Sequence, residues 1–489
     1  MITENTKNNK KVMKAWAFYD WANSVYSLVI TSTIFPIYYA ILTTAYEKNE
    51  YVTESHKWIK VPVRNTIKLF GNEYHPDAVY GYSLTISFLI VVLLSPILSA
   101  LADTIGNKKS FLQFFCYLGA TSCMGLALFT SMHTVFLGLL FSITASVGFW
   151  GSLVFYNSFL PDIATPDQQD ALSAKGYIYG YIGSVILVVI CLLLIMVVAQ
   201  TPKQAMILTR ISFLLTGAWW FGFSQYTFKH LPKFGKLTDK LPKDIVLLNI
   251  KNFFKTHKDN GGYAHVVKEN ILFYKEITKE SFRELFRAGN KLFTTPNLKY
   301  FLISFFFYSV GMQTIFLMAT LFGKSEINLS QEKLILTLIV IQIEAIIGAI
   351  FFSWLSRKIG NKNVISIAVI LWMVACLSAY YLNKENPNVE YQFYGVAGIV
   401  GLVMGGLQAM SRSTFSKLLP QDSMENTTYF SFYDVLEKVA IILGTFIFAT
   451  LIEKYNNMRY AALSMTIFFG IGLIFIRFLK LKNKEIRKL

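Results

Sequence analysis

Asp20 and Glu344 are two of the carboxylates that lie within long apolar segments of this 489-residue chain. Asp20 lies near the start of the first segment, and Glu344 lies near the middle of the eighth. A charge at the middle of a membrane span costs about 3 kcal/mol on insertion scales, so both acids should face protein or water. Such an acid can take up and release a proton, and we predict Glu344, alone or with Asp20, as a proton-coupling residue. Alternatively, hydrogen bonds to Gln313 or Gln342 hold Glu344 neutral for helix packing.

The first segment also carries a polar face. Asp20, Asn23, Ser24 and Ser27 are spaced i, i+3, i+4 and i+7, so they share one side of a helix. A polar face within a span should face a cavity rather than lipid. The alternative is a structural ion pair of Asp20 near the end of the span. We group six further residues with this face as candidates for substrate binding or coupling: Tyr26, Trp150, Asn157, Tyr177, Gln313 and Gln342.

A second set of charged residues falls near segment ends. Asp434 and Lys438 are four residues apart at the start of the eleventh segment and can pair along a helix. Arg412 ends the tenth segment on the same predicted side. We therefore predict a cytoplasmic gate that holds one conformation closed, against the alternative of a solvated helix end. Its members are Asp103, Gly106, Lys108, Arg412, Asp434, Glu437 and Lys438.

The elements that must position these residues are membrane spans. The chain is 54% hydrophobic and only 15% charged, too apolar for an ordinary soluble protein. Lipid requires every backbone group to be paired, so the spans should be helices. Runs of about 20 apolar residues predict an all-α polytopic protein with twelve transmembrane helices, near 15–43, 79–102, 110–130, 135–157, 176–199, 209–228, 300–321, 334–355, 364–382, 392–411, 429–452 and 460–479.

The chain divides into two similar halves. Ile-Gly-Asn-Lys occurs at 105–108 and again at 359–362, each time between two apolar segments, which indicates an internal duplication. We predict six-helix bundles over 1–228 and 300–489, joined by a connector over 229–299. An amphipathic segment from Tyr263 to Phe293 fits a helix on the inner membrane face, or a helix that braces the loops.

Cations mark the predicted cytoplasmic side. Of the 46 lysines and arginines, 33 fall on the side of both termini and the connector, which the positive-inside rule assigns to the cytoplasm. The net charge of +17 is thus a topology signal rather than a sign of nucleic-acid binding. We expect a cell (inner or plasma) membrane protein with both termini cytoplasmic.

Several classes of function lack the residues they need. The four cysteines all lie in apolar segments without paired spacing, which predicts neither disulfide nor metal. No histidine lies deep in a span and no phosphate-binding glycine loop occurs. We therefore expect neither an enzyme nor a cofactor. A receptor or scaffold stays open, although it has no need of acids within its spans.

The hairpin Asp103-x-x-Gly106-x-Lys108-Lys109, between the second and third of twelve spans, resembles a signature of the major facilitator superfamily. The resemblance implies two six-helix bundles that rock about a midplane cavity. In the hairpin, Gly106 permits the tight turn, and Asp103 is placed to accept donors from a neighbouring helix end.

Three further motifs resemble a narrower branch, the autophagy-related vacuolar amino-acid effluxers and their bacterial relatives. They are Tyr19-Asp20-Trp21-Ala22-Asn23-Ser24-Val25-Tyr26, Tyr308-Ser309-Val310-Gly311-Met312-Gln313-Thr314 and Gln408-Ala409-Met410-Ser411-Arg412-Ser413. The resemblance implies efflux or transport of amino acids or small peptides, and a sugar or other neutral organic solute is the alternative. We expect a monomeric, proton-coupled secondary transporter of a small neutral or zwitterionic solute.

Overall fold

The computed structural model describes residues 7–52, 57–64, 66–69, 71–232, 285–420, 425–455 and 457–480, together with 279, 282 and 283. Within these residues, twelve helical segments are long and apolar enough to cross a membrane. The prediction of an all-α polytopic fold with twelve spans is confirmed.

The first half is built from helices that mostly start at a proline or a polar cap. Proline occupies the first position of α3, α7 and α8, where its missing N–H costs nothing and its fixed φ suits the helix. The elements are α1 (Lys10–Asn23), η1 (Tyr26–Ile34), α2 (Phe35–Thr43), α3 (Pro76–Ile105), α4 (Lys108–Gly125), η2 (Leu126–Leu128), η3 (Met132–Thr134), α5 (Val135–Ser158), α6 (Leu160–Ile163), α7 (Pro166–Leu193), η4 (Leu194–Val198) and α8 (Pro202–His230).

The second half repeats this plan with longer uninterrupted helices. They are α11 (Pro296–Ser325), α12 (Gln331–Ile359), α13 (Asn361–Tyr381), α14 (Val389–Leu418), α15 (Asn426–Tyr455) and α16 (Met458–Arg477). In each half, the glycine of the repeated hairpin is the residue at which the preceding helix ends. Gly106 ends α3 with φ +73° and Gly360 ends α12 with φ +82°, and such values favour glycine because it has no Cβ.

The first span is interrupted in its middle. Its α-helical ends, α1 and α2, are joined by η1, a nine-residue π-helix from Tyr26 to Ile34. Short π-helical segments are rare and are frequent at functional sites. The wider turn alters which side chains share a face, so the simple 3.6-residue spacing holds only up to the end of α1.

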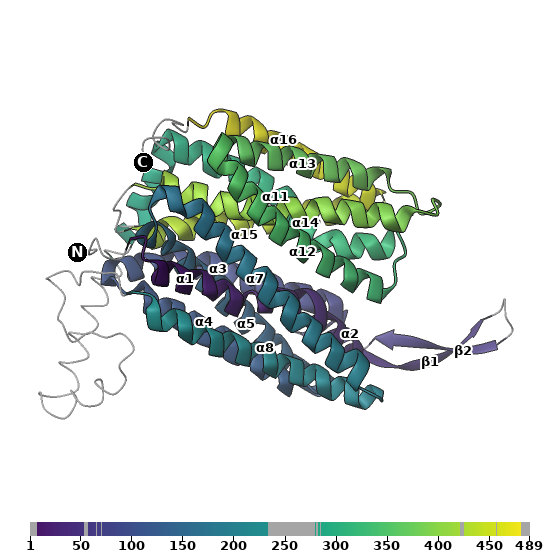
Figure 1. Ribbon diagram of the computed structural model, residues 1–489. Coiled ribbons are helices and arrows are strands. Elements are labelled where there is room, and N and C mark those ends of the chain that lie inside the picture. The colour runs from purple at the N-terminus through teal and green to yellow at the C-terminus, as the bar shows by residue number, and fades with distance from the viewer. Residues whose placement is uncertain are drawn as a thin grey trace, which may run out of the picture.

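Two β-hairpins fill the loop between the first two spans, which the apolar pattern did not predict. β1 (Thr44–Val52) pairs antiparallel with β2 (Lys57–Arg64), and β3 (Ile67–Leu69) pairs with β4 (Asn72–Tyr74). Figure 1 shows β1 and β2 projecting away from the bundles, at the end opposite the start of α1 and the end of α16. We call these two ends the hairpin face and the terminal face.

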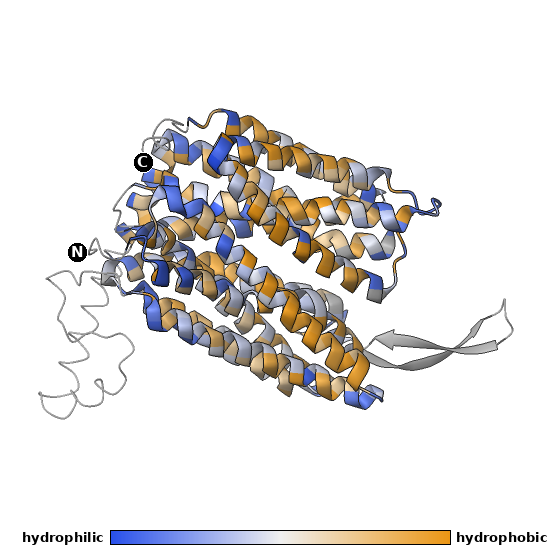
Figure 2. Ribbon diagram, viewed as in Figure 1, coloured by the Kyte–Doolittle hydropathy of each residue, from blue (hydrophilic) through white to orange (hydrophobic). Residues whose placement is uncertain are grey.

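The core is divided between the halves. One set of buried apolar residues comes almost entirely from 16–231 and the other almost entirely from 288–479. Figure 2 shows hydrophobic residues along the middle of the helices and hydrophilic ones toward both ends, as a membrane-crossing protein requires.

Most of the connector predicted over 229–299 lies outside the described residues. Its last part, 285–294, is helical. Ala288 and Leu292 are buried against the core of the second half, whereas Phe286 and Phe293 are exposed. This part of the connector therefore packs one side against the second half and leaves apolar side chains exposed on another.

Candidate functional site

A large cavity lies between the two bundles. Its volume is about 850 Å³, and α1, η1, α3, α5 and α7 line it on one side, facing α11, α12, α14 and α15 on the other. It reaches from Asp20 and Arg412 to Tyr82 and Thr85, near the start of α3 at the hairpin face. Cavities of this size hold small organic molecules.

Arg412 closes the cavity toward the terminal face. It belongs to α14 but its guanidinium inserts among helices of the first half and is only 2% exposed. Nε donates to Ser173 Oγ at 2.9 Å, Nη2 donates to the Ser173 carbonyl at 2.8 Å, and Nη1 donates to Asn157 Oδ1 at 3.2 Å. Its carbon Cζ lies 4.2 Å from the ring centroid of Tyr177. Arg412 thus joins the two bundles at the floor of the cavity.

Asp20 is the charge partner of Arg412. Its Oδ2 lies 3.4 Å from Arg412 Nη1 and accepts a hydrogen bond from the Tyr156 hydroxyl at 2.8 Å. Gly176 makes room for this pair, because a Cβ at that position would lie 2.5 Å from Asp20 Oδ2. Leaving one member of a buried ion pair without the other typically costs about 3–5 kcal/mol, so the two residues are expected to depend on each other.

A second group of charges lines the wall formed by α15. Lys438 is fully buried, and its Nζ donates to Asp434 Oδ1 at 2.6 Å and to Glu437 Oε2 at 3.2 Å. The same Nζ lies 3.7 Å from the ring centroid of Trp150, which belongs to the other bundle. Glu437 Oε1 accepts from Gln313 Nε2 at 2.7 Å. The predicted i, i+4 pairing of Asp434 with Lys438 is confirmed.

At the terminal face, the first half holds the start of α15. Asp103 accepts hydrogen bonds from Thr428 N at 2.7 Å, Thr428 Oγ1 at 2.8 Å and Thr427 N at 3.3 Å. A carboxylate at a helix N-terminus satisfies free N–H groups and opposes the positive end of the helix dipole. The predicted contact of Asp103 with a neighbouring helix end is confirmed. The Lys108 ammonium pairs nearby with Asp162, which accepts from Asn426 of α15.

A matching cluster joins the bundles on the other side of the terminal face. Asp170 of α7 accepts from Asn361 Nδ2 at 2.8 Å and Ser356 Oγ at 3.0 Å, and its Oδ2 lies 2.6 Å from Lys417 Nζ. Sequence reasoning missed Asp170, Asn361 and Lys417. The duplication carried a signal, because Asp170 near the start of α7 precedes Asn426 at the start of α15 by about 256 residues, close to the hairpin offset.

The ten candidate substrate or coupling residues are Asp20, Asn23, Ser24, Glu344 and the six grouped with them, and eight of the ten line the cavity: Asp20, Ser24, Tyr26, Trp150, Asn157, Tyr177, Gln313 and Gln342. Ser27 and Thr31 of η1 line it as well. Asn23 does not, although it is fully buried. The polar face of the first span that lines the cavity thus lacks one of the residues that the spacing predicted.

Glu344 faces protein, as expected of an acid in the middle of a span, but it does not face the cavity. Glu344 is half-buried on the side of α12 that packs against α14, where its Cβ would lie 2.9 Å from a Cβ added at Gly401. It is not among the residues that line the cavity. Gln313, one of the two glutamines expected to bond Glu344, donates its amide to Glu437 instead. A mid-span position fixes depth in the membrane but leaves the direction of the side chain open.

The predicted gate is in fact two separate sites. Asp103, Gly106 and Lys108 lie at the terminal face, whereas Asp434 and Glu437 line the cavity and Lys438 is buried beside them. Arg412 is not at a helix end, because α14 continues to Leu418. The apolar pattern ended the tenth span too early. Arg412 was therefore predicted at a helix end rather than in the lining of the cavity.

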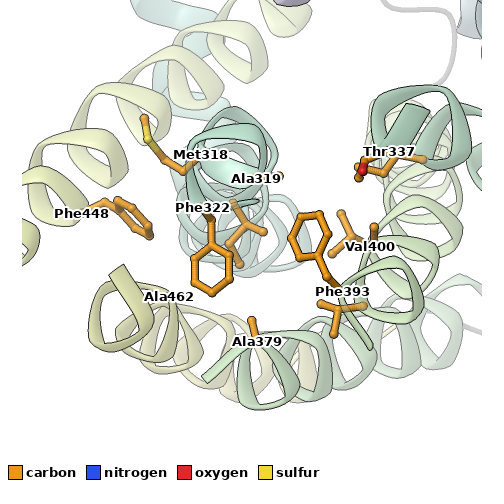
Figure 3. A pocket seen from close by; sticks show the side chains of 13 residues that line it. Met318, Ala319, Phe322, Thr337, Ala379, Phe393, Val400, Phe448 and Ala462 are labelled. Atoms are coloured by element: carbon orange, nitrogen blue, oxygen red, sulfur yellow. The ribbon is translucent and has the colours of Figure 1, made fainter. Parts of the chain in front are cut away.

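A smaller cavity of about 50 Å³ lies inside the second bundle. Figure 3 shows the rings of Phe322 and Phe393 in it, with Met318 and Phe448 nearby. The hydroxyl of Thr337, also in the lining, bonds the carbonyl of Lys333, so the cavity offers no free polar group. Among the described residues, no three His, Cys, Asp or Glu side chains gather as a metal site would. The chemistry therefore lies in the large cavity.

Comparisons with known proteins agree with this geometry. The family model described as "Vacuole effluxer Atg22 like" matches residues 8–488. An uncharacterised MFS-type transporter of Bacillus subtilis, YxiO, is 30% identical over 474 residues, which is 96% of this chain and 95% of that protein. Autophagy-related protein 22 of Kluyveromyces lactis is 24% identical, over 95% of this chain and 92% of that protein.

Solved structures support the fold. The proton:xylose symporter XylE, bound to a bromodeoxyglucose, superposes with a TM-score of 0.65 at 12% identity, over 96% of this chain and 94% of XylE. The Escherichia coli fucose:proton symporter FucP gives a TM-score of 0.62 at 14% identity, over 96% and 98%. These two are likenesses of fold alone. Taken with the match over nearly its whole length, they place the chain in the Atg22-like family of major facilitator superfamily transporters, a family of transporters rather than enzymes.

Proposed function

We propose that this protein is a secondary active transporter that moves a small amino-acid-like solute by alternating access. The observation that supports this most directly is the cavity of about 850 Å³ between the bundles. On its terminal-face side, contacts between the bundles close it. Arg412, Asp103 and Asp170 each contact the opposite bundle between the cavity and the terminal face. Breaking these contacts would let the bundles rock and expose the cavity on the other side.

The terminal face is proposed as cytoplasmic and the membrane as the cell membrane. The supporting observation is the excess of lysine and arginine on the side of the termini and connector. In this orientation the described conformation has its cavity reaching toward the outside. Cysteine labelling from outside intact cells should fail at both termini, and labelling at either one would reverse the orientation.

Proton coupling is proposed to involve Asp20 rather than Glu344. Asp20 lies at the cavity floor in a buried pair with Arg412. Protonation would remove the charge that opposes the guanidinium and weaken a contact between the bundles. We expect Asp20→Asn to abolish accumulation driven by a pH gradient while solute exchange remains measurable. Normal accumulation by this variant would remove Asp20 from the coupling mechanism.

The experiment that tests the function is uptake by the purified protein in proteoliposomes. The panel should hold amino acids, dipeptides and hexoses, each with and without a pH gradient. We expect uptake of amino acids or small peptides above that of protein-free liposomes. Uptake of a hexose alone would mean that the substrate is a sugar rather than an amino acid or peptide. If no member of the panel is taken up or stabilises the protein against heat, a scaffold function is favoured.

A further inference from the structure

The wall of the cavity formed by α15 has an excess of negative charge. Three carboxylates gather at the cavity, those of Asp20, Asp434 and Glu437. Two cations oppose them. Arg412 pairs with Asp20, and Lys438 alone serves both acids of α15. With every one of these groups ionised, the three carboxylates and two cations therefore sum to a net charge of −1 at the cavity.

The cavity also holds two buried acceptors that the protein leaves unused. Asp434 is only 4% exposed, and its Oδ2 has no hydrogen-bond partner within the protein. Gln342 is equally buried, and its Oε1 has none either. Among the described residues that line the cavity, these are the buried side-chain atoms without a partner, and both are oxygen acceptors. A solute that satisfies them must bring hydrogen-bond donors.

The two cations at the cavity are, by contrast, already engaged as donors. Arg412 directs its Nε and both terminal nitrogens to Ser173, Asn157 and Asp20. Lys438 donates to Asp434 and Glu437. To pair with either cation, a carboxylate or phosphate on the solute would have to displace one of these contacts, whereas a cation that pairs with the carboxylates would not.

Aromatic side chains complete the surroundings. Trp150 already faces the Lys438 ammonium at 3.7 Å, and Tyr433 and Phe305, whose ring centroids are 4.0 Å apart, line the same cavity. Carboxylates combined with aromatic faces are the usual surroundings of bound ammonium groups.

We propose that Asp434 and Glu437 bind a primary ammonium group of the transported solute, and that at equal length a solute of net charge +1 binds more tightly than a zwitterion. This inference rests on the proposed transport function and narrows its substrate class from amino-acid-like solutes in general to those that carry a primary ammonium group, with cationic ones preferred. Asp434 Oδ2 and Gln342 Oε1 accept the ammonium hydrogens, and Glu437 supplies the second charge.

The test is thermal stabilisation of the purified full-length protein in detergent by matched probes. L-lysine carries net charge +1, L-norleucine is a zwitterion of similar length, 2-hydroxyhexanoate lacks the ammonium, and glucose is uncharged. We expect L-lysine to bind about tenfold more tightly than norleucine, because a second charge-assisted contact is gained. The last two probes should give no stabilisation. Equal binding of 2-hydroxyhexanoate and norleucine would overturn the proposal.

Variants locate the effect. Asp434→Asn should weaken lysine binding about tenfold by removing one charge-assisted contact, and Glu437→Gln provides the same readout if the first variant does not fold. Glu344→Gln is the matched control, because it neutralises a carboxylate of another span that does not line the cavity. Equal losses in the control and the two variants would overturn the assignment.

Two further outcomes separate the alternatives. Stabilisation by sodium chloride over potassium chloride that is lost in Asp434→Asn would show that a metal cation occupies the acids, and would overturn the ammonium assignment. Uptake of glucose alone by proteoliposomes would overturn the ammonium site but leave transport intact. Absence of uptake for every probe would instead count against the transport function on which the proposal rests.

Discussion

Arg412 belongs to the second half, but its guanidinium is hydrogen-bonded by residues of the first half. Its donors go to Ser173, Asn157 and Asp20, all residues of the opposite bundle. Because a guanidinium presents five N–H groups in a fixed planar fork, no other side chain can replace this set of contacts. The residue therefore reports directly on whether the bundles are joined.

We predict that Arg412→Gln and Asp20→Asn are each destabilising and that the double variant recovers part of the loss. Each single change leaves one buried charge without its partner, at a cost of about 3–5 kcal/mol. In the double variant no charge remains, so the two losses should not add. Thermal unfolding of the four proteins in detergent measures the coupling. Additive losses would mean that the 3.4 Å contact contributes no stability.

The sequence predicted which residue types gather at the site but not every direction in which they point. Asp20 and Ser24 were found because polar residues in spans are unusual enough to mark a cavity. Glu344 satisfied the same criterion and faces α14 instead. Rotation of a helix about its axis is fixed by packing against its neighbours, and one sequence gives only a weak signal of that packing.

At the scale of elements, glycines decide how closely α7 approaches α1. A Cβ at Gly180 would lie 2.5 Å from Ser24 Oγ, and one at Gly183 would lie 2.8 Å from the Trp21 carbonyl. This glycine face of α7 thus contacts α1, and it lies beside the cavity floor. Such faces let membrane helices approach closely.

We predict that Gly176→Ala lowers transport at least tenfold, because the added methyl group would displace Asp20 or Arg412 by about an ångström, and small misplacements can cost about 100-fold in rate. Gly222→Ala on α8 is the control, since nothing lies within 4 Å of a Cβ there. Uptake rates normalised to folded protein give the comparison. Equal rates in the two variants would show that the close approach of α7 has no functional role.

The hairpin after α3 acts on a second element, the start of α15. Asp103→Asn keeps the size of the side chain but removes the charge that faces the α15 N-terminus, an interaction worth about 0.3–1 kcal/mol at exposed sites and about 2 kcal/mol when partly buried. We predict altered turnover with a normal folded yield, because the cavity itself is unchanged. Arg357→Gln, in the matching hairpin of the second half, is the control. Unchanged turnover in Asp103→Asn would reduce this contact to a static one.

At the scale of the molecule, the division into two halves was predictable and the contacts between them were not. The repeated Ile-Gly-Asn-Lys hairpins and twelve apolar runs indicated two similar bundles. The contacts Asp170–Asn361 and Asp162–Asn426 join residues more than about 190 positions apart, and hydrophobic periodicity carries no signal for such pairs. The β-hairpins were missed because the length criterion recognises only apolar runs.

Alternating access requires the bundles to separate at the terminal face, and a covalent link there should stop it. Ser158 Oγ and Thr427 Oγ1, one from each half, lie 3.3 Å apart. Disulfide sulfurs lie about 2.05 Å apart, so replacing both residues by cysteine needs little backbone movement to form a bond. We predict that oxidation of Ser158→Cys/Thr427→Cys abolishes net transport, that a reductant restores it, and that solute binding from the hairpin side persists.

The chain offers a matched control within one bundle. Cys116 Sγ and Ser224 Oγ, on α4 and α8, also lie 3.3 Å apart, so Ser224→Cys places a second cysteine beside the native one. Oxidation of this pair links two helices that move together in a rocking mechanism and should leave transport intact. If the link between bundles permits transport, or the link within one bundle blocks it as completely, rigid-body separation at the terminal face is not the transport step.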